Sequence, residues 1–161
     1  MKPLIIYSSY TGTTHKIATQ VHESCGGDLI EIKSWDIRSR FLMFFARYSP
    51  EMEVRNDGIP PQTIDVSGHD LVVIGTPVWM GKPTPAIKKT IDGLTGCAGK
   101  PAIVFTTCEE DPGTTLETMT KNLVTKGMRV TGQFSLTAEE IRDGTVIKTL
   151  IATVQDSGSG P

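Results

Sequence analysis

A hydroxyl-rich turn joins a short apolar run to an amphipathic segment near the start of the chain. Residues 4–7 form the apolar run, which is typical of a buried strand. Ile17, Ala18 and Val21 then follow with the spacing of one face of a helix. A strand that passes almost at once into a helix is the first half of a β-α-β unit. This feature therefore directs the chain toward an α/β fold.

The same turn, residues 8–14, has the chemistry of an anion site. It contains five Ser and Thr residues and Gly12. The start of a helix offers unpaired backbone N–H groups and the positive end of the helix dipole, and glycine lets the backbone approach a ligand closely. One or two hydroxyls would be enough to cap the helix. Because the turn carries more than capping requires, its composition favours a bound phosphate over a simple cap.

Spacing excludes two other kinds of phosphate-binding loop. The dinucleotide signature G-x-G-x-x-G does not occur in the turn. A nucleoside-triphosphate loop needs a fixed, shorter gap between its glycines, followed by Lys and then Ser or Thr. The nearest match has five residues between Gly75 and Gly81, and Lys82 is followed by Pro83. The phosphate ligand is therefore expected to belong to another class of cofactor.

Strand-like and helix-like segments alternate along the chain. This alternation predicts a parallel sheet with right-handed crossovers and helices on both faces. We expect a doubly wound, five-stranded parallel sheet with strand order 2-1-3-4-5 in a three-layer α/β/α arrangement. Residues 1–155 are expected to form a single domain, and residues 156–161 a flexible tail. The predicted strands are 4–7, 29–32, 70–75, 101–106 and 128–136, and the predicted later helices are 84–94, 114–126 and 143–154.

Composition and charge argue against several classes of function. The 161-residue chain carries a formal net charge of −2, which argues against nucleic acid as a partner. No apolar run is long enough to span a membrane, and no secretory signal is expected. Three scattered cysteines indicate reduced thiols and a cytoplasmic location. No Cys/His cluster has the spacing of metal ligands, so no metal site is predicted.

Three loops are expected to meet at the carboxyl ends of the strands, where open α/β sheets bind ligands. The first is the hydroxyl-rich turn. The second, residues 76–83, carries Trp79, whose flat ring is suited to stacking on a planar ligand. The alternative for Trp79 is a side chain folded back onto the core. The third, residues 108–113, is acidic over residues 109–111.

In these loops the sequence resembles the flavodoxin family. Residues 9–14 look like the family's phosphate loop, Gly75-x-x-x-Trp79 looks like its second flavin loop, and residues 105–109 stand where it has its third. The resemblance covers most of the chain and implies a flavodoxin-like fold that binds FMN without a covalent link. The residues that it assigns to cofactor binding are Ser9, Tyr10, Thr11, Gly12, Thr13, Thr14, Thr76, Pro77, Val78, Trp79, Met80, Gly81, Thr107, Cys108 and Glu109.

The chain departs from the family's pattern in its second and third loops. Many flavodoxins carry a tyrosine in the third loop, whereas residues 106–113 contain no aromatic residue, so one face of the flavin is expected to be open. Many also place glycine directly after the tryptophan, whereas here Met80 stands between Trp79 and Gly81. Cys108 has no basic neighbour in sequence that would activate its thiol, so we expect it to serve in packing.

Three functions agree with these observations. The first is an FMN-binding electron carrier that passes electrons to a redox protein partner. The second is an FMN-dependent NAD(P)H oxidoreductase that acts on a small acceptor such as a quinone. The third is a non-catalytic FMN-binding regulatory module. We predict no catalytic side chain, because the flavin would carry the chemistry. The apolar segment 35–48 is expected to be core, a cover over the flavin, or a homodimer or docking surface.

Overall fold

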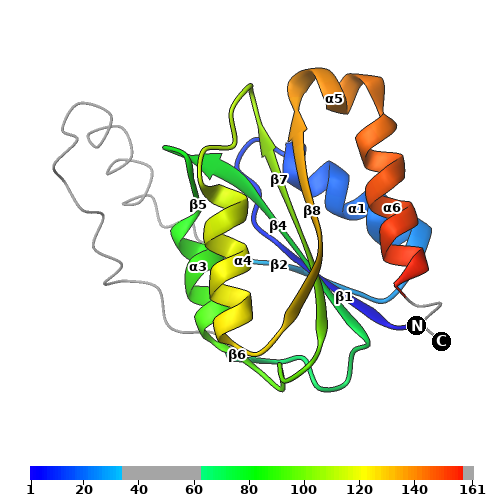
Figure 1. Cartoon of the computed structure of the whole chain (residues 1–161). Coiled ribbons are helices and arrows are strands. Elements are labelled where there is room, and N and C mark those ends of the chain that lie inside the picture. Colours follow the sequence, from blue (N-terminus) through cyan, green and yellow to red (C-terminus); the bar gives the residue numbers. More distant parts are fainter. Residues whose placement is uncertain (34–62, 158–161) are drawn as a thin grey trace, which may run out of the picture.

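Five parallel strands form the central sheet of the computed structural model, which describes residues 1–33 and 63–157 (Figure 1). Their spatial order is β2-β1-β4-β7-β8, which is the predicted order 2-1-3-4-5. The predicted doubly wound sheet is therefore confirmed. The strands are β1 (Pro3–Tyr7), β2 (Asp28–Glu31), β4 (Leu71–Trp79), β7 (Pro101–Cys108) and β8 (Arg129–Thr137).

The central strands form because their sequences are nearly unbroken apolar runs. All of β1, the first six residues of β4 and the middle six of β7 are buried. A parallel strand needs this pattern because helices cover both of its faces. The edge strand β8 instead alternates exposed and half-buried residues along most of its length. Burial therefore increases from the edge of the sheet toward its centre, where the candidate loops begin.

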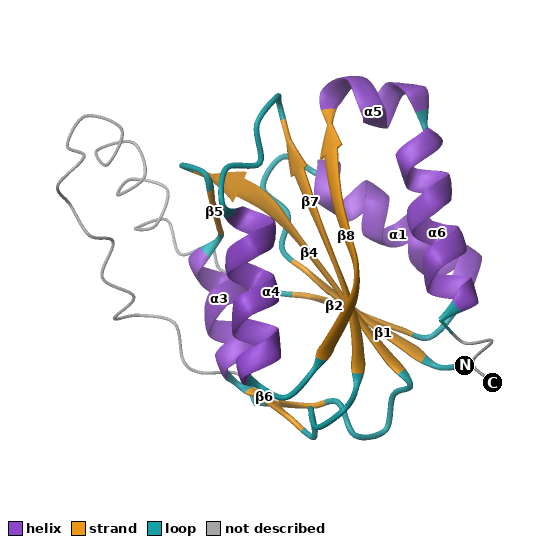
Figure 2. Cartoon of the chain, viewed as in Figure 1, coloured by secondary structure: helices purple, strands orange, loops and turns teal. Residues whose placement is uncertain are grey.

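Helices cover both faces of the sheet (Figure 2). α3 (Pro85–Asp92) and α4 (Thr115–Thr125) lie on one face, and α1 (Thr13–Cys25) and α6 (Thr145–Asp156) lie on the other. The buried apolar side chains of α3 and α4 belong to one core, and those of α1 and α6 belong to a second. The predicted three-layer arrangement is therefore confirmed.

The pairing of β1, β4 and β7 places the ends of these strands side by side. Tyr7 pairs with Gly75, and Thr76 pairs with Thr106. The backbone N–H of Ser8 donates to the carbonyl of Gly75 over 3.2 Å. The loops that follow the three strands therefore begin at the same edge of the sheet, as the sequence predicts.

The second loop differs from the prediction. The sequence predicts a loop over residues 76–83, but β4 continues through Trp79, turns, and returns as β5 (Lys82–Pro83). β5 pairs with the end of β4 in antiparallel fashion. The β-branched and aromatic residues Val78 and Trp79 favour a strand. The loop prediction is thus wrong for most of this segment, which forms a hairpin.

Besides β5, three short elements of the described residues are not predicted from the sequence. α5 (Ala138–Asp143) begins at a capping box, in which Thr137 Oγ1 accepts the N–H of Glu140 at 3.3 Å and the Glu140 carboxylate accepts the N–H of Thr137 at 2.8 Å. β3 (Ile64–Asp65) and β6 (Leu94–Thr95) pair in a separate two-stranded sheet. Each element is too short to give a periodic pattern. Only the capping box was a usable sequence signal.

Some predictions fall outside the described residues. The apolar segment 35–48, with its predicted roles in the core, over the flavin or in a homodimer, lies within residues 34–62, which the structure does not describe. Most of the predicted tail lies within residues 158–161, which are likewise outside it. In the two described stretches, no helix combines the length and the apolar character that crossing a membrane would require.

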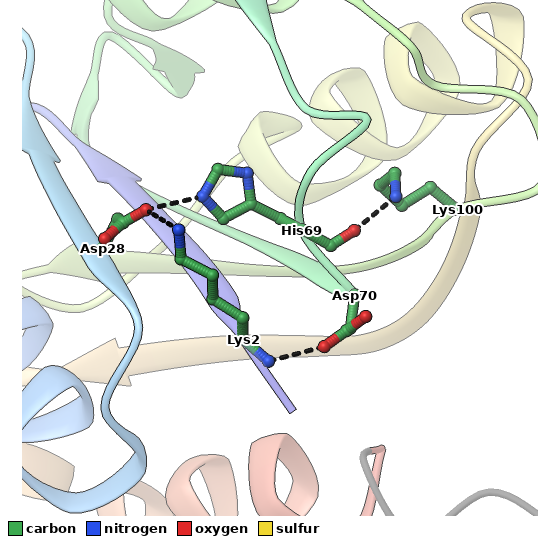
Figure 3. A network of polar contacts seen from close by, with 5 residues as sticks. All are labelled: Lys2, Asp28, His69, Asp70 and Lys100. Atoms are coloured by element: carbon green, nitrogen blue, oxygen red, sulfur yellow. Dashed lines mark hydrogen bonds and ion pairs between the residues drawn. The ribbon is translucent and has the colours of Figure 1, made fainter.

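Charged side chains connect the strands at the amino edge of the sheet (Figure 3). The Asp28 carboxylate accepts hydrogen bonds from Lys2 Nζ at 2.9 Å and from His69 Nε2 at 2.8 Å. The backbone N–H of Lys2 donates to the Asp70 carboxylate at 2.6 Å, and the Lys100 ammonium donates to the carbonyl of His69. These contacts join the starts of β1, β2 and β4 at the edge opposite the candidate loops.

This network predicts an acid-sensitive contribution to stability. The hydrogen bond from Lys2, and then the one from His69, hold the pKa of Asp28 below its ordinary value. A carboxylate with a lowered pKa stabilises the fold above its unfolded pKa, and the contribution is lost as pH falls through the folded pKa. We therefore expect Asp28→Asn to be less stable than the wild type at neutral pH and to lose less of its stability between about pH 5 and pH 2.

Urea unfolding at a series of pH values measures this difference. Asp92→Asn is a suitable control, because the Asp92 carboxylate makes no hydrogen bond or ion pair within the described ranges. The control should follow the wild-type pH dependence. If Asp28→Asn also followed it, the Asp28 carboxylate would not stabilise the amino edge.

Candidate functional site

The hydroxyl-rich turn, residues 8–14, connects β1 to the first turn of α1. Gly12 precedes the helix with a φ of 92°, a left-handed conformation that favours glycine. The Ser9 hydroxyl oxygen accepts the N–H of Gly12 and the N–H of His15, both at 3.2 Å. Two backbone donors at the helix start are therefore paired with one side-chain oxygen of the same turn.

Other backbone donors of this turn are unpaired within residues 1–33 and 63–157. The N–H groups of Thr11, Thr13 and Thr14 donate to no group there. The hydroxyls of Thr11 and Thr13 lie 3.3 Å apart in an exposed position, and the first turn of α1 carries no acidic residue. A phosphate dianion needs several N–H and O–H donors when it leaves water. The donors of the turn are of the kind and number that the predicted phosphate loop requires.

Tyr7 lies buried beside this turn. Its hydroxyl is 2.6 Å from Nδ1 of His15. Burial, and then the charge of Glu31, raise the pKa of Tyr7. The phenol therefore stays protonated and can donate a hydrogen bond to the imidazole. This contact ties the end of β1 to the first turn of α1.

A buried hydroxyl pair joins the start of α1 to the end of β7. Thr14 Oγ1 lies 2.8 Å from Thr107 Oγ1, and the two residues are only 1% and 5% exposed. Both residues are among those predicted to bind the cofactor. Because their side-chain oxygens face each other, these two hydroxyls hold the start of α1 against the end of β7.

A second hydroxyl cluster joins the first loop to the β4–β5 hairpin and to α3. Thr84 Oγ1 lies 2.9 Å from Ser8 Oγ and 3.3 Å from the hydroxyl of Thr76. Thr84 also caps α3 by accepting the N–H of Ile87 at 3.4 Å. Ser8 and Thr84 are not among the predicted site residues. A Thr-Pro pair marks a helix start, but no pattern in the sequence shows that Thr84 contacts a serine 76 positions earlier.

An aromatic pair links the first loop to the second. The rings of Tyr10 and Trp79 meet edge to face, with centroids 5.9 Å apart and planes at 87°. Tyr10 is exposed, Trp79 is half-buried, and Trp79 is part of neither apolar core. The pair presents flat apolar surface of the kind that contacts a planar ligand. The predicted neighbours Pro77 and Val78 are half-buried in the same strand.

The third loop contributes carboxylates. Glu109, Glu110 and Asp111 are all exposed. The Glu109 carbonyl accepts the N–H of Ala138 at 3.4 Å, which brings the acidic start of α5, with the exposed Glu139, beside this loop. The exposed carboxylates of residues 109–111 thus form an acidic rim beside the acidic start of α5.

Cys108 is half-buried at the end of β7. Burial raises the pKa of its thiol, the contact with Ser135 Oγ at 3.7 Å opposes that effect, and the nearby carboxylates add to it. The thiol therefore stays protonated at neutral pH, which agrees with the packing role expected from the sequence. Among the residues that the structure describes, no group of three or more His, Cys, Asp and Glu side chains could hold a metal ion.

The fold and these loops together define a class of protein. A parallel sheet of this order binds its ligand where the strand order reverses, and the donor-rich turn and the aromatic pair stand at that point. These are the features of a flavodoxin-like protein. The chain belongs to the NADPH-dependent FMN reductase family, whose model matches residues 1–141. The family supports FMN as the cofactor and confirms the flavodoxin-like resemblance drawn from the sequence.

Solved structures share this fold. A Bacteroides uniformis protein described as a flavoprotein is 23% identical, with a TM-score of 0.68 over 94% of this chain and 97% of that one. A Lactobacillus acidophilus flavoprotein in complex with FMN is 22% identical, with a TM-score of 0.60 over 88% and 97%. Two-electron reduced Megasphaera elsdenii flavodoxin is 15% identical, with a TM-score of 0.66 over 96% and 98%. No curated protein matches the chain.

The Thr14–Thr107 pair yields a prediction about stability. Thr14→Val keeps the shape of the side chain and leaves the Thr107 hydroxyl buried without its partner, so we expect a loss of about 1–2 kcal/mol in the free energy of unfolding. Replacing both residues with Val should recover most of that loss, because no buried hydroxyl is then left unpaired. Urea unfolding of the wild type, both single variants and the double variant measures the coupling. Simply additive losses would mean that the two hydroxyls do not stabilise each other.

Proposed function

We propose that the protein binds FMN without a covalent link and transfers electrons through it to a redox partner. The observation that carries this proposal is the set of backbone N–H groups at Thr11, Thr13 and Thr14 that are unpaired within the described residues. The exposed hydroxyls of Thr11 and Thr13 lie beside them. These donors would hold the FMN phosphate at the start of α1, where the helix dipole favours an anion. When bound, FMN supplies reversible uptake of electrons, and the chain supplies its position and its electrostatic surroundings.

The aromatic pair supports the placement of the flavin ring. Trp79 would pack against the ring system, with Tyr10 holding the indole from the side of the phosphate loop. Residues 107–109 would border the ring from the end of β7, as the resemblance implies. The hydroxyl pair of Thr14 and Thr107 keeps this border next to the phosphate loop.

The charge distribution favours an electron carrier. The carboxylates of residues 109–111 and Glu139 are exposed beside the candidate site. Such a rim attracts a basic protein surface and repels the phosphate groups of a nicotinamide cofactor. We therefore propose a cytoplasmic redox protein with a basic docking surface as the electron-transfer partner.

Direct reduction by NADPH is the second candidate. The family is that of NADPH-dependent FMN reductases, and residues 106–113 carry no aromatic side chain that would cover the flavin. An uncovered flavin face is accessible to a nicotinamide donor and to a small acceptor such as a quinone. In this version the same site would serve an oxidoreductase without a protein partner.

The phosphate loop can be tested by comparing two flavins. Thr13→Val removes one hydroxyl from the donor set, so we expect FMN to bind about tenfold or more weakly. Riboflavin lacks the phosphate, so its affinity should be the same for the wild type and the variant. Fluorescence titration measures both affinities, and Thr11→Val should act in the same direction.

Thr149→Val, on the exposed side of α6, is the matched control and should leave both affinities unchanged. An equal loss of affinity for FMN and riboflavin in Thr13→Val would place the phosphate elsewhere. If wild-type protein failed to bind FMN at all, the proposed function would be wrong.

Redox titration separates the carrier from the reductase. In a carrier, we expect bound FMN to be reduced in two separate one-electron steps. In each step the potential should change by about 59 mV per tenfold change in the ratio of oxidised to reduced flavin. NADPH should then be oxidised only when a separate reductase is added. A single two-electron step of about 30 mV per tenfold change, together with sustained NADPH oxidation in the presence of a quinone, would support the reductase instead.

A further inference from the structure

The β4–β5 hairpin ends in a tight turn at Met80 and Gly81. The returning strand pairs with β4 at two positions, Val78 with Pro83 and Trp79 with Lys82. The Thr76–Thr84 contact lies at the base of the hairpin, away from the turn. Both turn residues have positive φ, 52° at Met80 and 74° at Gly81, and this conformation is unfavourable for methionine. The Met80 side chain is 72% exposed, so it does not anchor the turn. A hairpin this short is not stable by itself, and its position must be fixed by other contacts.

The start of α4 supplies these contacts. The Gly81 carbonyl accepts the backbone N–H of Thr114 at 2.8 Å and the hydroxyl of Thr114 at 3.2 Å. Gly113 lies directly against Gly81: a Cβ added to Gly113 would be 2.4 Å from Gly81 Cα and 2.6 Å from the Gly81 oxygen. The Asp111 carboxylate accepts the N–H of Gly113 at 2.8 Å and so holds the preceding bend. The two glycines therefore meet backbone to backbone.

We propose that this contact between Gly81 and residues 113–114, here named the glycine clasp, positions Trp79 for the flavin. The proposal rests on the proposed FMN site. Trp79 lies two residues before Gly81 and pairs directly with Lys82 across the hairpin, so a displaced turn displaces the indole. The same displacement would part Trp79 from Tyr10 in the first loop. Gly113 and Thr114 are thus positioning residues that act through Trp79.

Two glycine variants separate the effect of losing the contact from the effect of backbone strain. Gly113 and Gly144 both have positive φ, 56° and 78°, so alanine is strained at either position. Only Gly113→Ala also meets backbone atoms, because nothing lies within 4 Å of a Cβ at Gly144. We expect Gly113→Ala to bind FMN about three- to tenfold more weakly, as for the loss of one aromatic contact. The bound flavin should also be more fluorescent, because a displaced indole quenches it less. Gly144→Ala should match the wild type in FMN affinity and in flavin fluorescence.

A double variant tests whether the clasp acts through Trp79. In a Trp79→Ala background, adding Gly113→Ala should cause no further loss of affinity. Riboflavin should lose affinity by the same factor as FMN in Gly113→Ala, because the clasp acts on the ring and not on the phosphate. This response is opposite to the one expected for Thr13→Val, so an effect on the phosphate loop is distinguishable from an effect on the clasp.

A milder variant decides the question if Gly113→Ala does not fold. Thr114→Val removes the hydroxyl bond to Gly81 and keeps the N–H bond, so it should give a smaller change in the same direction, and Thr114→Ser should restore the wild-type values. Two results would overturn the clasp alone. One is wild-type FMN affinity and flavin fluorescence in both Gly113→Ala and Thr114→Val. The other is that Gly113→Ala lowers FMN affinity by the same factor in the Trp79→Ala background as in the wild type. Failure of the wild type to bind either flavin would overturn the proposed function and the clasp with it.

Discussion

Buried hydroxyl groups at the carboxyl edge of the sheet need partners within the protein, because water does not reach them. Leaving one unpaired costs about 1–3 kcal/mol. Thr14 meets this need with Thr107, and Ser8 meets it with Thr84. The partners in each pair come from different segments of the chain, so pairing the hydroxyls also fixes these segments relative to one another. The candidate site is therefore organised by the hydrogen-bonding requirements of the fold before any ligand is considered.

The two edges of the sheet are stabilised by different chemistry. Charged groups such as Lys2 and Asp28 hold the amino edge, whereas the turn of residues 8–14 offers neutral hydroxyls and amides. Neutral donors stabilise a phosphate without cancelling its charge. With the carboxylates of residues 109–111 nearby, a flavin in this site would have negative surroundings, which oppose the addition of an electron. The arrangement that holds the cofactor would then also favour a low reduction potential.

The order of the sheet could be predicted from the sequence because each central strand is a buried run bounded by turn residues. The length of β4 could not, because Thr76, Pro77 and Val78 follow an apparent stop at Gly75, and strand pairing with β5 outweighs that local signal. The hydroxyl and amide donors of residues 9–14 are contiguous, so this turn could be recognised in the sequence, and its role as a phosphate loop stays a prediction. The Thr14–Thr107 contact joins residues 93 positions apart, and no local pattern encodes such a pair.

Trp79 shows how long-range contacts position a side chain whose role stays ambiguous in the sequence. From the sequence, a tryptophan at this position fits a lid on the core as well as a stacking surface. In the structure it belongs to neither core and instead touches Tyr10, and the turn beyond it is held by Gly113 and Thr114. The orientation of one indole thus depends on the first loop, the hairpin and the start of α4 together. A side chain held from three directions is a preorganised surface, and preorganisation lowers the entropy that binding a planar cofactor would otherwise cost.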